Sequence, residues 1–156
     1  MEPSGYSATP LAKKLGIKSK FKIRLFNQPN YYYDLFSDLP QDIIVLTDKK
    51  SKKDFIHYFA LNTATLNKDI KQLRQEIEEN GMIWISWYKK SAKIETDLNE
   101  NIIRDIALDN GLVDVKVCAI DDLWSGLKLV IRMKDRKKMN QLQNGMQQTR
   151  YCHNAG

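Results

Sequence analysis

The sequence predicts an α/β fold in which a doubly wound, mostly parallel sheet ends in an antiparallel hairpin. Two observations support this prediction. Helical segments alternate with short apolar strands along the chain, as they do in parallel sheets that are covered on both faces. The last two strand-like runs, residues 113–120 and 127–132, are separated by a polar break too short to hold a helix, so the two runs are expected to pair antiparallel.

The chain begins with a predicted short helix over residues 9–16. Thr9 is expected to cap its first turn, and Gly16 suits a left-handed exit. Residues 21–26 alternate between apolar and polar side chains, which predicts a strand with one buried face. After a polar turn, a further helix is expected to start within residues 31–36.

The second and third strands are expected at residues 42–47 and 55–61. The first of these runs is apolar at residues 43–46, which is typical of a strand buried on both faces. The link between them, residues 49–54, is shorter than the dozen or more residues that a helical crossover normally takes. The two strands therefore either pair as a hairpin, or the second is a very short edge strand. We favour the edge strand.

Apolar residues at helical spacing predict a longer helix over residues 66–77. Thr63 or Thr65 is expected to cap it, and the Asn-Gly pair at residues 80–81 to end it. Residues 82–88 then form a strand rich in aromatic and β-branched residues.

The same spacing predicts another helix over residues 98–106. Thr96 is expected to cap it, with acidic residues in the first turn that suit the positive end of the helix dipole, and a second Asn-Gly pair at residues 110–111 to end it. The whole order of elements is that of class I methyltransferase-like folds.

Length and composition bound the kind of protein. A chain of 156 residues suits one domain, assigned to residues 1–133, and its apolar runs are far shorter than the ~20 residues that span a bilayer. The first residues do not resemble a signal peptide. Cys118 and Cys152 form neither a disulfide framework nor a metal-binding spacing. A cytoplasmic protein without a membrane association is therefore expected.

The net charge of +6 is concentrated at the C-terminal end of the chain. Residues 134–156 hold five basic residues and one acidic residue, a net charge of +4, which leaves +2 for residues 1–133. This polar tail is expected to be disordered. Helical spacing in the tail predicts, as an alternative, a weak amphipathic helix on Met139, Leu142 and Met146.

Several blocks of the sequence are similar to one family. Residues 5–18, 84–90, 111–119 and 124–129, together with Thr96-Asp-Leu and Ile103-Arg-Asp, resemble the bacterial domain-of-unknown-function 3052 family over about residues 5–132. The resemblance implies a cytosolic protein with a methyltransferase-like sheet and no assigned reaction. The chain departs from the family at Tyr88, where proline is usual, and in its tail.

A nucleotide cofactor is disfavoured by the turn after the first strand. Residues 26–33 contain no glycine that would let the backbone approach a phosphate or a methionine carboxylate, and Pro29 removes one N–H donor. No cofactor is therefore predicted. Asp48 lies about twenty residues further on, where an acid that binds ribose would be expected, but without the glycine turn we interpret it as a turn residue.

One edge of the predicted sheet is a candidate ligand site. If the sheet is mainly parallel, lysines and aromatic residues from several strand ends gather there, which suits an anion such as a phosphate compound or single-stranded nucleic acid. The alternative, that these are solvated loop lysines, is favoured. The candidate residues are Tyr31, Tyr32, Lys49, Lys50, Asn62, Trp87, Lys89 and Lys90.

The hairpin offers a second candidate surface, formed by Arg104, Lys116, Asp121 and Trp124. These residues suit a pocket or a partner surface, with the two cations as ion partners. The favoured alternative is that Asp121 forms the turn while Trp124 packs on a helix. No catalytic group is predicted, because His57 lies in an apolar strand and Cys118 among small apolar residues.

Three functions remain open at this level. The leading hypothesis is a non-catalytic binding or regulatory domain that uses a sheet edge or a homodimer interface. The alternative is an enzyme that acts on an anionic, phosphate- or nucleotide-containing substrate at the lysine-rich edge. The weakest is an RNA-associated protein, because nucleic acid is an improbable partner for a nearly neutral folded region.

Overall fold

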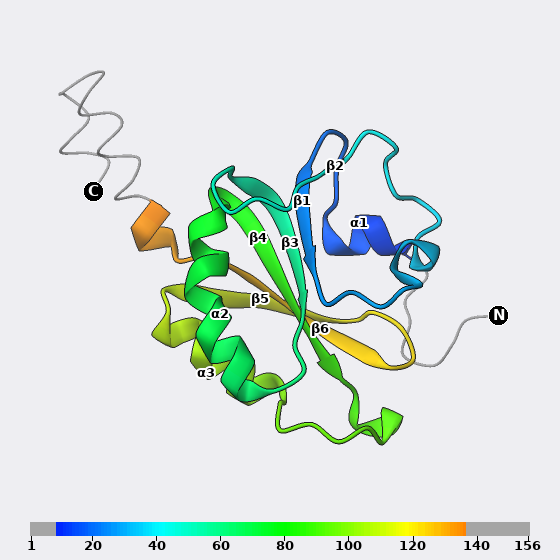
Figure 1. Cartoon of the computed structure of the whole chain (residues 1–156), viewed down its shortest axis with the longest axis vertical. Helices are drawn as coiled ribbons and strands as arrows, with labels where there is room; N and C mark the ends of the chain where they lie inside the picture. Colours follow the sequence, from blue (N-terminus) through cyan, green and yellow to red (C-terminus); the bar gives the residue numbers. More distant parts are fainter. Residues whose placement is uncertain (1–8, 137–156) are drawn as a thin grey trace.

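A mostly parallel sheet forms the centre of the molecule (Figure 1). The structure, a computed structural model, describes residues 9–136. Within them the sheet has six strands in the order β2-β1-β3-β4-β6-β5. The four strands β2, β1, β3 and β4 are parallel, and β6 pairs antiparallel with both β4 and β5. The pairing of β5 with β6 is the hairpin that the sequence predicted. The strands are β1 (Lys22–Phe26), β2 (Ile44–Val45), β3 (Lys53–Phe59), β4 (Ile77–Tyr88), β5 (Leu112–Ala119) and β6 (Trp124–Ile131).

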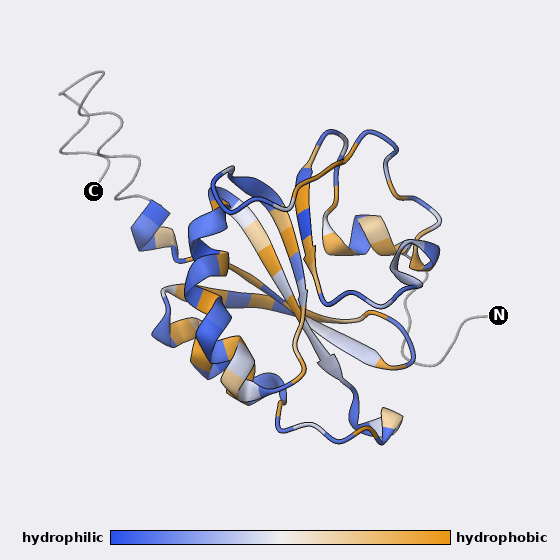
Figure 2. Cartoon of the chain, viewed as in Figure 1, coloured by the Kyte–Doolittle hydropathy of each residue, from blue (hydrophilic) through white to orange (hydrophobic). Residues whose placement is uncertain are grey.

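Helices cover the two faces of this sheet unequally. The longer helices α2 (Thr63–Glu76) and α3 (Glu100–Asp109) pack on one face, and the short helix α1 (Leu11–Leu15) packs on the other (Figure 1). Each face has its own apolar core, and Figure 2 shows hydrophobic residues concentrated in the central strands. Two short 3-10 helices, η1 (Tyr32–Leu35) and η2 (Lys90–Ala92), lie in the connections.

The second strand is a short edge strand, as expected. Ile44 and Val45 pair in parallel with the start of β1 and not with β3. The expectation that this run is buried on both faces is wrong, because its side chains are 45% and 47% exposed. Since β2 ends level with Ile23, residues 46–52 have to cross only one strand to reach β3, and they need no helix to do so.

Asparagine residues cap the two long helices, in place of the threonines that the sequence predicted. Asn62 accepts a hydrogen bond from the Thr65 N–H at 2.8 Å. Asn99 accepts one from the Ile102 N–H at 2.9 Å. An N-cap oxygen satisfies a backbone donor that has no partner within the helix, and Asn and Thr both provide one, so the pattern alone did not decide between them.

The helix α2 ends before the Asn-Gly pair that was predicted to end it. Glu76 is its last residue, and Gly81 lies inside β4, where a bulge interrupts the pairing with β3. A Cβ atom at this position would lie 3.0 Å from the Lys53 carbonyl oxygen, so close backbone approach requires the glycine. The second Asn-Gly pair does end α3, and Gly111 has a φ of 79° there.

The N-terminal helix depends on a distant carboxylate. Pro10 occupies its N-cap position in place of Thr9, and the Asp38 carboxylate accepts hydrogen bonds from the N–H groups of Ala12 and Lys13. Gly16 forms the predicted left-handed exit, with a φ of 87°. The sequence could not indicate Asp38, because this contact spans more than twenty residues.

The predicted tail begins as part of the folded domain. Residues 133–136 form a helical turn, and Asp135 pairs with Arg74 at 3.3 Å and Arg132 at 3.2 Å. The rest of the predicted disordered tail, including the alternative helix on Met139, Leu142 and Met146, lies outside the described residues. Within residues 9–136 none of the helices has the length and apolar character needed to cross a membrane.

Candidate functional site

Aromatic side chains pack on the α1 face of the sheet, near the C-terminal end of β1. The turn after β1 is held by Asn27, which has a φ of 58° and donates a hydrogen bond to the Phe59 carbonyl oxygen at 3.2 Å. The helix η1 then brings in Tyr32, whose side chain is 1% exposed. Its ring makes edge contacts with Phe36 and Phe59. The segment after the glycine-free turn therefore folds back onto the α1 face of the sheet.

His57 lies in the centre of this aromatic group. One ring nitrogen, Nδ1, lies 2.9 Å from the Tyr32 hydroxyl, and the other, Nε2, lies 2.8 Å from the Ser86 hydroxyl. The imidazole also stacks on Phe59, with ring centroids 4.3 Å apart. Burial lowers the pKa of His57 to about 3 and raises the pKa of Tyr32.

The contact between Ser86 and His57 resembles a nucleophile and its base, but both residues are fully buried and a substrate has no access to them. His57 is a satisfied core residue, as the sequence indicated. We call Tyr32, His57, Phe59 and Ser86 the Tyr32 cluster.

Asp121 and Trp124 of the candidate hairpin surface have structural contacts. Asp121 accepts hydrogen bonds from the N–H groups of Leu123 and Trp124, which forms the turn, and from the Tyr31 hydroxyl at 3.0 Å. Burial and this contact with Asp121 raise the pKa of Tyr31. Trp124 is buried and stacks on Tyr88 at 4.1 Å, in the same apolar core as Ala12 and Leu15 of α1.

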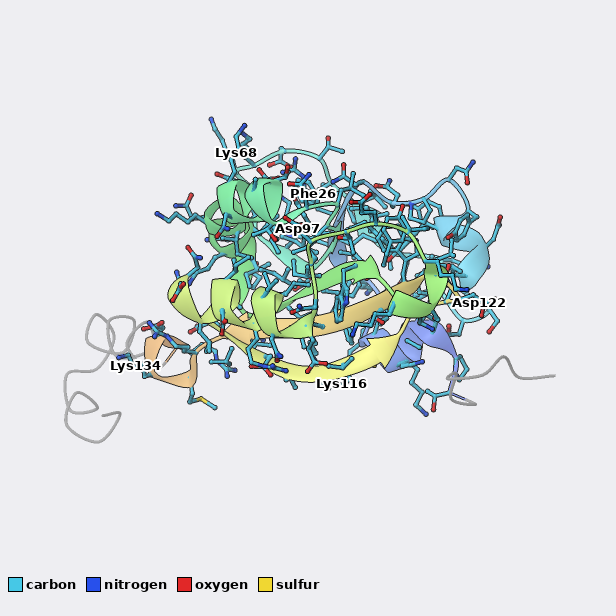
Figure 3. The ribbon with its side chains drawn as sticks, turned by 90° about the horizontal axis from the view of Figure 1, so that it is seen from below. Phe26, Lys68, Asp97, Lys116, Asp122 and Lys134 are labelled. Atoms are coloured by element: carbon cyan, nitrogen blue, oxygen red, sulfur yellow. The ribbon has the colours of Figure 1, made fainter. Side chains whose placement is uncertain are left out.

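Arg104 and Lys116 do not serve as ion partners for Asp121. Arg104 pairs with Glu100 on its own helix and with Asp114 of β5 at 3.0 Å. Lys116 is exposed on β5 opposite Lys128. The hairpin candidates therefore belong to separate environments. Figure 3 places Lys116 on the side of the molecule opposite to Lys68 of α2.

Part of the predicted lysine edge forms a cleft beyond the C-terminal end of β4. This strand-end cleft has a volume of about 380 Å³ and is bounded by the end of β4, the loop that contains η2 and the start of α3. Trp87 is 7% exposed within it. Across the same loop, Asp97 accepts a hydrogen bond from the Thr63 N–H at 2.9 Å, which links the cleft to Asn62 at the start of α2. The predicted candidates that line the cleft are Trp87, Lys89 and Lys90.

Lys49 and Lys50 lie at the other end of the sheet, which corrects the expectation of one continuous lysine edge. Their loop precedes β3, and the neighbouring Lys52 donates a hydrogen bond to the Gln75 carbonyl oxygen at the end of α2. Because α2 runs back from the end of β3 to its start, this contact lies far from the strand-end cleft. The short β2 is the cause, since it ends level with the beginning of β1.

Asp48 is a turn residue, as we interpreted it. Its carboxylate accepts hydrogen bonds from the N–H groups of Lys50 and Ser51 and from the Ser51 hydroxyl. These contacts, with the Ser51 hydroxyl first, lower the pKa of Asp48 to about 2. Asp48 therefore has no position from which to bind a ribose beyond the strand ends.

A second cleft contains residues that the sequence did not indicate. It lies between β1 and α2, has a volume of about 280 Å³, and we call it the β1–α2 cleft. Glu76, at its base, is fully buried and accepts hydrogen bonds from Arg24 at 2.7 Å and Lys53 at 2.9 Å. Burial would raise the pKa of Glu76, but the hydrogen bonds from Lys53, Gln72 and Arg24 outweigh burial and lower it.

Sequence patterns gave little signal for this charged group. Glu76 stands at the end of an amphipathic helix, where a carboxylate is ordinarily solvated, and Lys53 stands in a run of loop lysines. Only the sheet order brings them together. Cys118 is partly buried against the α1-face core. Among residues 9–136 no cluster of three or more His, Cys, Asp or Glu side chains could hold a metal ion.

The fold belongs to the class I methyltransferase-like class. The chain is similar to a putative type 11 methyltransferase from Sulfolobus solfataricus, with a TM-score of 0.58, 14% identity, and coverage of 79% of this chain and 90% of the other. It is also similar to a ribosomal protein L11 methylase from Lactobacillus delbrueckii subsp. bulgaricus, with a TM-score of 0.51, 12% identity, and coverage of 77% and 74%. At these identities the likeness shows the fold alone.

No protein-family profile and no curated protein matches the chain. Membership of the domain-of-unknown-function 3052 family therefore stays a prediction from the quoted residues.

The residues at the end of β1 do not fit the cofactor S-adenosylmethionine. In sheets of this kind a ligand lies beyond the C-terminal strand ends, against a glycine-rich turn with available N–H groups. Here Pro29 has no N–H to donate, and the buried ring of Tyr32 occupies the side of the turn that faces β3. The chain therefore has the fold of methyltransferases but lacks the backbone donors that a glycine-rich first turn would offer to the cofactor.

Proposed function

We propose that this protein is a binding or regulatory domain on a methyltransferase-like sheet, and that it does not use S-adenosylmethionine. The observation that supports this most strongly is the burial of Tyr32 at the end of β1, with its hydroxyl bound to His57. A partner protein or a second copy of the chain suits a scaffold whose first turn has no glycine and packs its tyrosine onto the sheet. A cytoplasmic location is part of the proposal, because the cysteines form no disulfide framework.

Isothermal titration of the full chain with S-adenosylmethionine and with S-adenosylhomocysteine tests the proposal. We expect no binding heat with either compound at concentrations up to about 1 mM, well above the range in which enzymes usually bind their substrates. Dissociation constants in the micromolar range, together with amide NMR shifts at residues 27–33, would overturn the proposal. Tyr33→Ala, an exposed neighbour in the same turn, serves as the matched control for Tyr32→Ala if binding is seen.

A second candidate function is an enzyme or binding site for an anionic, phosphate- or nucleotide-containing ligand at the strand-end cleft. The specific observation that favours it is the position of that cleft, beyond the end of a parallel strand and beside the N-terminus of α3. Lys89 and Lys90 supply positive charge there. RNA is the weakest candidate ligand, and salt-sensitive retention on an RNA column would favour it.

Thermal-shift assays with ATP, AMP and a short RNA separate these candidates. If the strand-end cleft binds an anion, the Lys89→Gln/Lys90→Gln variant should lose the stabilisation that wild type gains. The control variant Lys71→Gln/Lys116→Gln removes the same charge from exposed positions outside the cleft and should retain it. The absence of stabilisation in wild type, or equal loss in both variants, would contradict this second function.

A further inference from the structure

The β1–α2 cleft has an unusual charge balance. Three cationic side chains line it, Arg24, Lys49 and Lys68, and a fourth, Lys53, lies behind its base. Two carboxylates, Asp69 and Glu76, face them. Four positive and two negative groups leave a net charge of +2. The cleft therefore attracts anions, although it lies on a folded region that is nearly neutral as a whole.

The buried carboxylate at the base holds the arginine in place. Arg24 and Lys53 both donate to Glu76 Oε1, and the Gln72 side chain donates to Oε2 at 3.0 Å. Two cations on one carboxylate leave a surplus positive charge that is largely shielded from water, because the Arg24 side chain is only 15% exposed. Arg24 uses Nη1 for its contacts with Glu76 and with the Asp48 carbonyl oxygen. The rest of the guanidinium remains to donate to an anion.

The two lysines at the rim have no such internal partner. Within residues 9–136, the ammonium groups of Lys49 and Lys68 make no hydrogen bond or ion pair. The other carboxylate of the cleft, Asp69, already accepts a hydrogen bond from the Tyr58 hydroxyl at 2.5 Å. One lysine comes from the β2–β3 loop and the other from α2, so their ammonium groups approach the cleft from two sides.

The remaining lining is apolar. Phe26 of β1 and Leu73 of α2 border the cleft, and the Arg24 guanidinium lies 4.3 Å from the centre of the Phe26 ring. Figure 3 shows Phe26 and Lys68 on the same side of the molecule. A volume of about 280 Å³ suits a small metabolite and is too small for a dinucleotide.

We propose that the β1–α2 cleft binds a small phosphomonoester, with the phosphate between Arg24, Lys49 and Lys68 and the organic group against Phe26 and Leu73. A phosphomonoester carries a charge of nearly −2 at pH 7, which matches the net charge around the cleft. This site is separate from the Tyr32 cluster and from the strand-end cleft. The proposal therefore stands or fails independently of the function proposed above.

NMR titration of the full chain with phenyl phosphate tests the proposal, with inorganic phosphate and benzyl alcohol as the two partial ligands. We expect saturable amide shifts at residues 24–26, 49 and 68–76. Phenyl phosphate should bind more tightly than inorganic phosphate, and benzyl alcohol should cause no saturable shift. Shifts confined to the strand-end cleft, or no saturable shift at all, would overturn the proposal.

A matched pair of variants distinguishes specific binding in the β1–α2 cleft from general electrostatic attraction to a positively charged surface. Lys49→Gln/Lys68→Gln should weaken binding by roughly tenfold for each lysine, because each charge-assisted contact contributes on the order of one to two factors of ten. Lys50→Gln/Lys71→Gln removes the same charge from the same loop and the same helix, at exposed positions outside the cleft, and should bind like wild type. Equal weakening in both variants would contradict the proposal.

Discussion

The surroundings of β1 differ between the two faces of the sheet. On the α1 face, the turn after β1 folds back and the Tyr32 cluster closes the space with aromatic rings. On the α2 face, the β1–α2 cleft separates β1 from the helix α2 and has charged groups at its base. One strand thus has a buried neutral environment on one side and a charged one on the other.

The two faces are therefore stabilised by different interactions. The Tyr32 cluster buries apolar rings and satisfies both nitrogens of a neutral histidine, so it can close without ion pairs. The base of the β1–α2 cleft holds three charged groups that are stable only together, because a buried charge without its partner is costly. The following four changes, from the largest expected effect to the smallest, test this contrast.

Removal of Glu76 should have the largest effect. Glu76→Ala leaves Lys53 fully buried without its carboxylate, which is expected to lower the free energy of unfolding by about 3–5 kcal/mol. Urea unfolding followed by circular dichroism measures it. Asp105→Ala, an exposed acid on α3, is the control and should change stability by less than about 0.5 kcal/mol. A loss for Glu76→Ala no larger than the control would show that the charged group is not needed.

Acid should weaken the Tyr32 cluster through His57. The pKa of His57 is about 3 in the folded protein and 6.5 when exposed, so between these values the unfolded chain binds the extra proton. The contribution of neutral His57 to the free energy of unfolding is therefore fully present above pH 6.5. It is lost as the pH drops toward 3, and about 2 kcal/mol of it is lost between pH 7 and pH 5.

The difference between wild type and His57→Gln isolates this contribution from that of the carboxylates. We expect the variant to be less stable at pH 7 and to show a correspondingly weaker loss between pH 7 and pH 5. Parallel pH profiles for the two proteins would mean that His57 accepts a proton in the folded state.

Loss of one hydroxyl tests how much the Tyr32 cluster depends on its hydrogen bonds. Tyr32→Phe keeps the ring but removes the partner of His57 Nδ1, and should cost about 1.5 kcal/mol. Tyr33→Phe removes the hydroxyl of an exposed neighbour and should be close to neutral. Chemical denaturation of both variants gives the comparison. If Tyr32→Phe costs no more than Tyr33→Phe, the Tyr32 cluster is stabilised by the packing of its rings and not by this hydrogen bond.

The smallest effect is expected at the start of α2, the helix that forms one wall of the β1–α2 cleft. Asn62→Ala removes the hydrogen bond to the Thr65 N–H and should cost about 1 kcal/mol. Thr65→Ala, one of the predicted cap positions, should cost less, because its side chain is not the cap. The thermal unfolding midpoints of both variants measure the difference. A larger loss for Thr65→Ala than for Asn62→Ala would instead support Thr65 as the cap, as the sequence predicted.

Much of the fold could be predicted because its signals are local. Apolar spacing indicated the helices, the polar break indicated the hairpin, and the short link at residues 49–54 indicated an edge strand. Gly16 and Gly111 marked helix ends because a left-handed residue is needed there. Gly81 was also predicted to end a helix, but it lies within β4. There the close approach of the Lys53 backbone requires a glycine.

The candidate sites were less predictable because their members come from distant segments. Trp87, Lys89 and Lys90 lie together because they follow one another in the chain. Lys49 was assigned to the wrong end of the sheet, since that depended on how far β2 extends along β1. Trp124 shares a core with α1, as a helix contact would require, but its ring contacts with Tyr88 and Phe59 come from other strands and had no local signal.

The sequence by itself determined the alternation of helices and strands, the closing hairpin and the glycine-free turn after β1, because each depends on residues within a few positions of one another. Only the tertiary structure decided that Tyr32 meets His57 and that Arg24, Lys53 and Glu76 share one buried group. These contacts join residues 23 to 52 positions apart. Their formation depends on strand order and register, which no local pattern encodes.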